Sequence, residues 1–303
     1  MDLPVTTPMW TERSIEVIHI EPTDVCQASC PQCARETDPE FDASQRHHLH
    51  PRDVAEIIPD HITTDLHKVL MCGVYGDPAA GRYTLDLARW FRKQQPAVIL
   101  GLHSNGGIAN ADWWRELASL MRHSQDYVVF SIDGLEDTNH VYRRGVSWHR
   151  VMQNVEAYIQ AGGPAHWDML VYQHNQHQVE ACESLARSMG FGWFRAKVTR
   201  RPMTAALQVP QGWNQPQLGS EIRCHALAEH SIYIDAQGRV SPCCWLGGRQ
   251  SGFVQDFREV QATWSTDQPN PVCQSVCGSV SGITSFQQQW QKTVEFRAAE
   301  INT

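Results

Sequence analysis

Residues 15–33 read Ile15-Glu-Val-Ile-His-Ile-Glu-Pro-Thr-Asp-Val-Cys-Gln-Ala-Ser-Cys-Pro-Gln-Cys33. The first six residues form a mainly apolar run that predicts a β-strand, and the loop that follows carries three cysteines, Cys26, Cys30 and Cys33. Three thiolates that lie close together can hold three corners of an iron–sulfur cube and leave the fourth iron without a protein ligand. Because an iron with an open position can bind a substrate or cofactor, the spacing indicates chemistry rather than scaffolding.

Two other uses of these cysteines are open. They could join His47, His48 or His50 in a tetrahedral zinc site, since three thiolates and one imidazole are a known zinc ligand set. A disulfide is less favoured, because a 303-residue chain with ten cysteines is no small secreted scaffold.

Size and charge exclude several classes of function. The chain is long enough to bury a substantial core and to form one large domain plus a small one. Its formal net charge of −8 argues against general nucleic-acid binding, which requires a basic stripe. No apolar run approaches the roughly 20 residues that cross a bilayer, and the first residues do not resemble a secretion signal. We therefore expect a cytoplasmic protein without a nucleic-acid or membrane partner, whose cysteines serve metal or redox chemistry.

Short apolar runs alternate with amphipathic helical stretches from residue 14 to about residue 200. After the first strand, the runs that predict strands are 69–71, 98–100, 127–130, 169–172 and 193–198. The intervening stretches repeat apolar residues at helical spacing, and Pro51 opens the first of them. This order predicts βα units around a parallel sheet. Six units are too few for an eightfold barrel, so the expected fold class is α/β with a partial (β/α)6 barrel.

The alternation ends near residue 200, which we take as the end of a core domain, 1–200. Residues 201–219 contain three prolines and several Gln and Gly residues, and this composition is typical of a connector. A second, smaller domain would then span 220–303. Within it, the sequence around Gly238 predicts a β-hairpin.

The spacing Cys-x3-Cys-x2-Cys after a first strand resembles that of the radical S-adenosylmethionine (SAM) enzymes. The resemblance implies a [4Fe-4S] cluster whose open iron is chelated by the amino and carboxylate groups of SAM. It also implies that an electron from the cluster breaks a carbon–sulfur bond of SAM and releases a 5′-deoxyadenosyl radical. Family members often carry a hydrophobic residue before the third cysteine, near the adenine; because Gln32 stands there, adenine packing is expected to differ.

Ligands of parallel α/β folds bind beyond the carboxyl ends of the strands, where this chain has polar, glycine-rich segments. Residues 73–78, Gly-Val-Tyr-Gly-Asp-Pro, resemble the family's Gly-Gly-Glu-Pro element. The resemblance implies that Gly76 and Asp77 receive the SAM amino group; the alternative is an ordinary turn. Ser104 and Asn105 belong to a segment similar to the family's Thr-Asn-Gly and are further candidates for SAM binding.

The segment after the fourth run resembles the Ser-x-Asp-Gly…Arg pattern of members with C-terminal cluster domains. The resemblance implies that Ser131 and a later arginine hold the SAM carboxylate, which suits a planar guanidinium able to bond both oxygens. We favour Arg150 over Arg144, and a solvated surface arginine is the alternative for each. Asn175, after the fifth run, is a candidate contact to the ribose or methionine atoms.

A second cysteine array lies near the C-terminus. The pattern Cys-x13-Gly-x4-Cys from Cys224 to Cys243 resembles the opening of SPASM and twitch domains. The resemblance implies an auxiliary [4Fe-4S] cluster on a hairpin-plus-helix domain, with Cys273 and Cys277 as the other two ligands, and the cysteine count fits the twitch form. A structural zinc site of four thiolates is the alternative. The spacing leaves Cys244 spare.

We interpret the chain as a radical SAM oxidoreductase or epimerase that abstracts a hydrogen atom, supplied with electrons by a donor such as flavodoxin or ferredoxin. An auxiliary cluster suits oxidation or crosslinking because it can accept an electron. Epimerisation needs a hydrogen donor instead, for which Cys244 is the first candidate and Cys72 the next; the alternative for both is packing.

The substrate class rests on the resemblance alone. Twitch-bearing relatives act on ribosomal peptides or on small sugars and cyclitols, and on family frequency we favour a peptide over a small molecule. A zinc-stabilised binding protein without catalysis is the alternative from another class.

Overall fold

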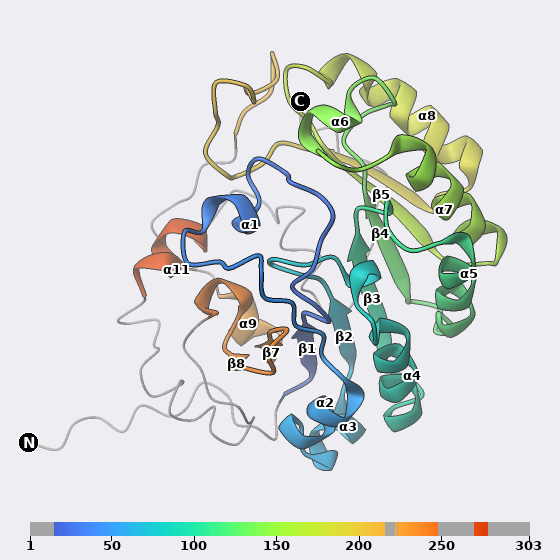
Figure 1. The fold of residues 1–303 in the computed structure, drawn as a ribbon, viewed down its shortest axis with the longest axis vertical. Coiled ribbons are helices and arrows are strands. Elements are labelled where there is room, and N and C mark those ends of the chain that lie inside the picture. Colours follow the sequence, from blue (N-terminus) through green and yellow to red (C-terminus); the bar gives the residue numbers. More distant parts are fainter. Residues whose placement is uncertain (1–14, 216–221, 223, 248–269, 278–303) are drawn as a thin grey trace, which may run out of the picture.

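The computed structural model describes residues 15–215, 222, 224–247 and 270–277. Its strands are β1 (Val17–Ile20), β2 (Lys68–Met71), β3 (Ile99–Ser104), β4 (Tyr127–Ser131), β5 (Ala165–Leu170), β6 (Trp193–Lys197), β7 (Ser231–Ile234) and β8 (Val240–Ser241). They form one sheet in the order β6-β5-β4-β3-β2-β1-β7-β8 (Figure 1). All neighbouring strands are parallel except β7 and β8. The predicted α/β class with a partial barrel is confirmed.

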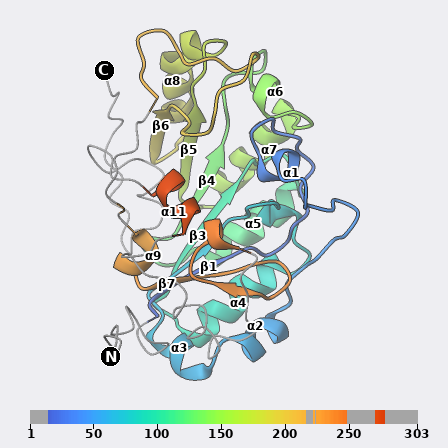
Figure 2. The ribbon, with the colours of Figure 1, turned by 90° about the vertical axis from the view of Figure 1, so that its left-hand side faces the viewer.

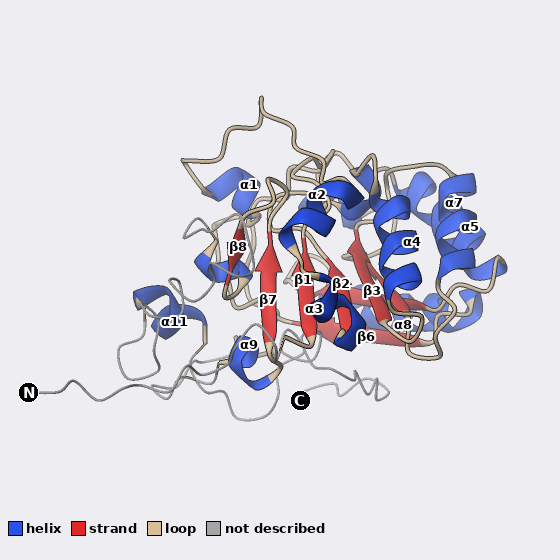
Figure 3. Ribbon diagram, turned by 90° about the horizontal axis from the view of Figure 1, so that it is seen from below, coloured by secondary structure: helices blue, strands red, loops and turns tan. Residues whose placement is uncertain are grey.

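The α-helices of the described residues are α1 (Ala34–Thr37), α2 (Pro51–Ile57), α3 (Asp60–Asp65), α4 (Thr84–Gln94), α5 (Ala111–Leu120), α6 (Asn139–Tyr142), α7 (Trp148–Gln160), α8 (Val179–Met189), α9 (His225–Ala228) and α11 (Pro271–Val276). Short 3-10 turns are η2 (Pro78–Ala80), η3 (Gln176–Gln178) and η4 (Cys244–Leu246). Helices α4, α5 and α7 lie along one side of the sheet, whereas α9 and α11 lie near its β7–β8 end (Figures 1 and 3). None of these helices is long and apolar enough to cross a membrane.

The two faces of the sheet differ in character because successive side chains of a strand point to opposite faces. Residues such as Ile18, Val69 and Leu100 are fully buried in the hydrophobic core that the helices complete. Their neighbours in the strands, among them His19 and His103, point to the inner face. The inner face is therefore rich in polar side chains, and it forms the floor of the cavity described below.

This alternation explains two wrong strand boundaries. We expected the third strand at 98–100 and the fifth at 169–172, but the structure has β3 at Ile99–Ser104 and β5 at Ala165–Leu170. Both strands carry inner-face polar residues, so a search for continuous apolar runs found only their apolar ends. The register of β5 matters for function, because it places Asp168 opposite Arg195 of β6.

The predicted hairpin is present: β7 and β8 are antiparallel, and Gly238 adopts a left-handed conformation with φ +79° in the connecting turn. However, β7 also pairs in parallel with β1 and so continues the main sheet. The connector residues 201–215 contain no helix or strand, in agreement with their composition. Residues 216–219 and most of the segment 220–303 lie outside the described residues.

Candidate functional site

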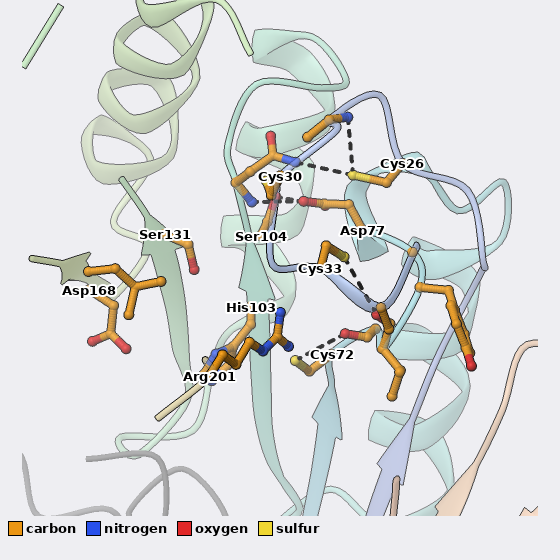
Figure 4. Close-up of a pocket in the computed structure, with 18 of the residues that line it drawn as sticks. Cys26, Cys30, Cys33, Cys72, Asp77, His103, Ser104, Ser131, Asp168 and Arg201 are labelled. Carbon is orange, nitrogen blue, oxygen red and sulfur yellow. Dashed lines mark hydrogen bonds between the residues drawn. The ribbon is translucent and has the colours of Figure 1, made fainter. Parts of the chain in front are cut away.

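Three thiols lie on the loop between β1 and α1. Cys26, Cys30 and Cys33 line one cavity of about 290 Å³, and α1 begins directly after Cys33. Figures 1 and 2 show α1 at the end of the sheet opposite α2 and α3, and Figure 4 shows the three side chains around the same space. The structure therefore brings together the three cysteines that we predicted as ligands of a cluster.

The histidines that could have completed a zinc site have other partners. Nδ1 of His47 lies 2.5 Å from the Asp24 carboxylate, Nδ1 of His48 contacts the Thr23 hydroxyl, and His50 caps α2. None of the three lines the cavity of the cysteines. Around a single zinc ion, thiolates lie only about 4 Å apart. Within the described ranges, no three His, Cys, Asp or Glu side chains converge to hold one metal ion.

The loop after β2 closes over this cavity. Its backbone N–H groups at Tyr75 and Gly76 donate to Oε1 of Glu21, at 2.7 and 2.8 Å. A Cβ atom on Gly73 would lie 2.0 Å from the carbonyl oxygen of Gly76, and one on Gly76 would lie 1.8 Å from that of Thr23. Both positions therefore require glycine, because the backbone segments approach too closely for any side chain.

Asp77 ends this loop with its carboxylate committed to protein donors. It accepts hydrogen bonds from the Ser104 hydroxyl (2.8 Å) and from the backbone N–H groups of Asn105 (2.7 Å) and Ala79 (2.9 Å). Burial raises the pKa of Asp77, and these three bonds oppose that shift. The contacts fasten the end of β2 to the end of β3. Its contact with a ligand amino group stays a prediction, although Gly76, Asp77, Ser104 and Asn105 all line the cavity.

The arginine at the cavity is Arg143, which the sequence reasoning passed over. Its Nε bonds Oδ2 of the fully buried Asp133 at 2.6 Å, and its side chain lines the cavity beside Ser131. Arg150 and Arg144 are exposed and do not line the cavity. The preference for Arg150 is corrected on this point: it begins α7, where its backbone N–H bonds Ser147, and the loop before that helix turns it away from the site.

Asn175 is also placed differently from our expectation. It is fully buried, and its amide donates to the carbonyl oxygens of Asp133 and Leu170 while its oxygen accepts from Tyr172. Because the side chain is used to order the loop after β5, it does not line the cavity. The misplaced fifth strand caused this error.

Several cavity residues were missed altogether, and they lie on the inner face of the sheet. His103 of β3, Asp168 of β5 and Lys197 of β6 line the cavity, together with Arg201 beyond β6 (Figure 4). Nζ of Lys197 lies 2.5 Å from the Asp168 carboxylate, which Arg195 also bonds. Burial acts to raise the pKa of Asp168, but these two cations outweigh it and hold the pKa well below its usual range. Alternation of polar and apolar residues was the signal that could have found this set.

His166, next to Asp168 on the inner face, makes folding stability depend on pH. Burial lowers its pKa from 6.5 to about 4. The unfolded state therefore binds more protons between these values, so the free energy of unfolding rises with pH across the window and is lost as pH falls through it. Between pH 5 and pH 7.5 this difference is worth about 2 kcal/mol. We expect His166→Phe to reduce the pH dependence by that amount in urea unfolding, and equal slopes in both proteins would contradict the assignment.

The C-terminal cysteines surround a second, smaller cavity. Cys224, Cys243, Cys244 and Cys277 line it, while Cys273 is buried one turn before Cys277 on α11. Burial raises the pKa values of Cys224 and Cys243 to about 12. The structure thus gathers residues from α9, the hairpin and α11, although they are more than 50 positions apart in sequence from first to last. Cys244 lines the first cavity as well as the second.

The sequence model described as "Radical SAM superfamily" matches residues 20–186, which contain the cysteine loop and five of the six parallel core strands. The chain belongs to the radical SAM superfamily. No curated protein sequence matches it.

Solved structures agree with this radical SAM fold. SuiB of Streptococcus suis bound to S-adenosylmethionine is 14% identical with a TM-score of 0.59, over 78% of this chain and 63% of SuiB. The enzyme anSMEcpe with bound AdoMet is 14% identical with a TM-score of 0.61, over 84% of this chain and 78% of that one. Native anSMEcpe with AdoMet and the Cp18Cys peptide is 13% identical with a TM-score of 0.59, over 83% and 81%. This chain therefore spans less than two thirds of the length of SuiB.

The radical SAM family implies a [4Fe-4S] cluster and SAM, and the donor set of the first cavity fits them. Burial raises the pKa of Cys26 to about 12, so a positive charge is needed to hold the thiolate. Polar donors already point at two of the sulfurs: the backbone N–H of Ala28 lies 3.4 Å from Sγ of Cys26, and Nη1 of Arg143 lies 3.9 Å from Sγ of Cys30. Such donors favour the thiolate over the thiol.

Proposed function

We propose that this protein is a radical SAM enzyme that cleaves SAM reductively and abstracts a hydrogen atom from a bound substrate. The observation that carries the proposal is the position of Cys26, Cys30 and Cys33 around one cavity, at the carboxyl ends of parallel strands. The bound [4Fe-4S] cluster and SAM would together supply the 5′-deoxyadenosyl radical, with electrons from a donor such as flavodoxin or ferredoxin.

The protein's own residues would hold and orient SAM. The backbone of the loop 73–77 lines the cavity and would take the amino group. Arg143 would pair with the carboxylate, since its guanidinium lies in the cavity and keeps N–H groups that Asp133 does not use. Ser131 lines the same wall and would support that carboxylate.

We further propose that the segment 220–303 is a twitch-type domain that holds an auxiliary [4Fe-4S] cluster. Cys224, Cys243 and Cys277 share one cavity, and Cys273 on the same short helix would be the fourth ligand. A cluster with four protein ligands leaves no open iron, so its role would be to accept or pass electrons.

A peptide is the proposed substrate, and its modification would be oxidation, crosslinking or epimerisation. The peptide bound in the anSMEcpe structure supports this choice. Within the cavity, Asp168, Lys197 and Arg201 form a charged wall that the proposed SAM contacts leave for substrate. Cys244 lies between the two cavities and would be the hydrogen donor of an epimerisation, after which the external donor would restore the electron and a proton.

Anaerobic reconstitution with iron and sulfide tests the proposal. We expect about eight iron atoms per chain, because two [4Fe-4S] clusters are proposed. With dithionite and SAM, the protein is expected to form 5′-deoxyadenosine. The double variant Cys243→Ala/Cys277→Ala should retain about four irons and still cleave SAM, because it leaves the first cavity intact.

Colourless, zinc-rich protein that leaves SAM intact would overturn the proposal and favour a zinc-stabilised binding protein. Once a substrate peptide is found, incubation in deuterated water separates the reactions. Epimerisation places solvent deuterium in the product, and Cys244→Ala should prevent this; normal stereochemistry and rate in that variant would remove the donor role.

A further inference from the structure

A buried carboxylate connects the two halves of the site. Glu21 directly follows β1, and its side chain is 1% exposed. Its Oε1 accepts from the N–H groups of Tyr75 and Gly76, as described above, and its Oε2 accepts from the hydroxyl of Tyr233 at 2.5 Å. One carboxylate thus joins the loop after β2 to strand β7.

The loop has little freedom to relax if this carboxylate moves. Gly73 and Gly76 already lie against the backbone with no room for a Cβ atom. The N–H of Asp77 donates to the carbonyl of Val25 at 2.9 Å, which ties the loop to the residue before the first cysteine. The two bonds to Oε1 therefore fix the position of the Tyr75 and Gly76 backbone within this frame.

Tyr233 reaches Glu21 because β7 lies beside β1. Their register pairs Tyr233 with His19 and Ile234 with Ile20, and the N–H of Glu21 donates to the carbonyl of Ile234 at 2.8 Å. The same strand leads through β8 to Cys243 and Cys244. The hairpin that carries cysteines of the second cavity is therefore hydrogen-bonded to the residue that holds the loop of the first.

Burial makes the carboxylate depend on its donors. Removal of a buried group from water disfavours its charge, and burial raises the pKa of Glu21 to about 7, while the bonds from Tyr233, Gly76 and Tyr75 oppose that shift. Loss of the Tyr233 hydroxyl would leave Oε2 buried without a donor and would weaken Oε1 as an acceptor for the loop.

We propose that Glu21 and Tyr233 form a positioning pair through which the C-terminal hairpin holds the 73–77 loop in its SAM-binding geometry. The inference rests on the proposed function, because it takes this loop as the receptor of the SAM amino group. Its consequence is that SAM affinity depends on a hydroxyl outside the region that the family model matches.

The test compares Tyr233→Phe with wild type in two measurements. In the protein without SAM, amide hydrogen exchange at Tyr75 and Gly76 should become faster, while the melting transition shifts no more than in the control. In the reconstituted protein, the dissociation constant for SAM should rise about tenfold, as expected for loss of a hydrogen bond to a charged group. Iron content should stay unchanged.

The control is Tyr158→Phe, which removes another buried tyrosine hydroxyl. Tyr158 lies on α7 and contacts the carbonyl of Pro164, away from both cavities. Its SAM affinity and loop exchange should match wild type. Should Tyr233→Phe fail to fold, Glu21→Gln replaces it: the amide oxygen can keep only part of the three bonds, so loop exchange should again rise.

Unchanged exchange at Tyr75 and Gly76 in the Tyr233→Phe protein would overturn the inference, as would unchanged SAM affinity. Failure of wild-type protein to bind SAM would instead overturn the proposed function. The exchange measurement then still decides whether the pair holds the loop, because it needs neither cluster nor SAM.

Discussion

Replacement of Cys30 by alanine is expected to reduce SAM cleavage to the background of cluster-free protein. Cys30 is 7% exposed and lines the cavity with Cys26 and Cys33. With two thiolates left, the cube would lack one of three ligands and would not assemble in a form with a single open iron. The measurements are iron content and 5′-deoxyadenosine formed in the presence of dithionite.

Cys182→Ala is the matched control. This thiol is fully buried on α8 in the hydrophobic core and lines neither cavity. We expect a loss of about 1 kcal/mol in the free energy of unfolding, with SAM cleavage retained. Cleavage by the Cys30 variant at the wild-type rate would refute the assignment of the first cavity.

Arg143→Met is expected to lower both stability and SAM affinity. Arg143 and Asp133 form a buried pair, with side chains 16% and 0% exposed. Removal of one partner leaves an uncompensated buried charge, which destabilises a protein by about 3–5 kcal/mol. If Arg143 also pairs with the SAM carboxylate, the dissociation constant for SAM should rise by at least about tenfold.

Arg150→Met provides the comparison, since Arg150 was the residue that sequence resemblance favoured. It is exposed on α7, so its replacement should change the unfolding free energy by no more than about 0.5 kcal/mol and leave SAM affinity unchanged. Chemical unfolding and SAM titration of both variants decide between the two arginines. A stronger effect from Arg150 would contradict the structural assignment.

Local sequence was enough to predict features that depend on short range. The cysteines of the first loop are only three and four positions apart, so one loop brings all three to one cavity. The hairpin around Gly238 was predicted for the same reason, because a tight turn needs a residue that tolerates positive φ. Apolar runs gave the number and order of the parallel core strands.

Long-range pairing was not readable in the same way. The Arg143–Asp133 pair and the contact of Asn175 with Leu170 depend on how loops fold back on the ends of β4 and β5. Motif position alone could not separate Arg143 from Arg150. The inner-face residues were missed because a strand whose polar side chains face an internal cavity resembles the half-exposed strand of an ordinary surface.

By itself, the sequence determined the class of the fold and the thiol loop, since strand periodicity and ligand spacing are local properties of the chain. Only the tertiary structure decided that β7 adds to β1, that Tyr233 meets Glu21 and that Cys244 lies between two cavities. These contacts join residues up to about 220 positions apart, and burial selects them through packing and hydrogen bonding that no local pattern records.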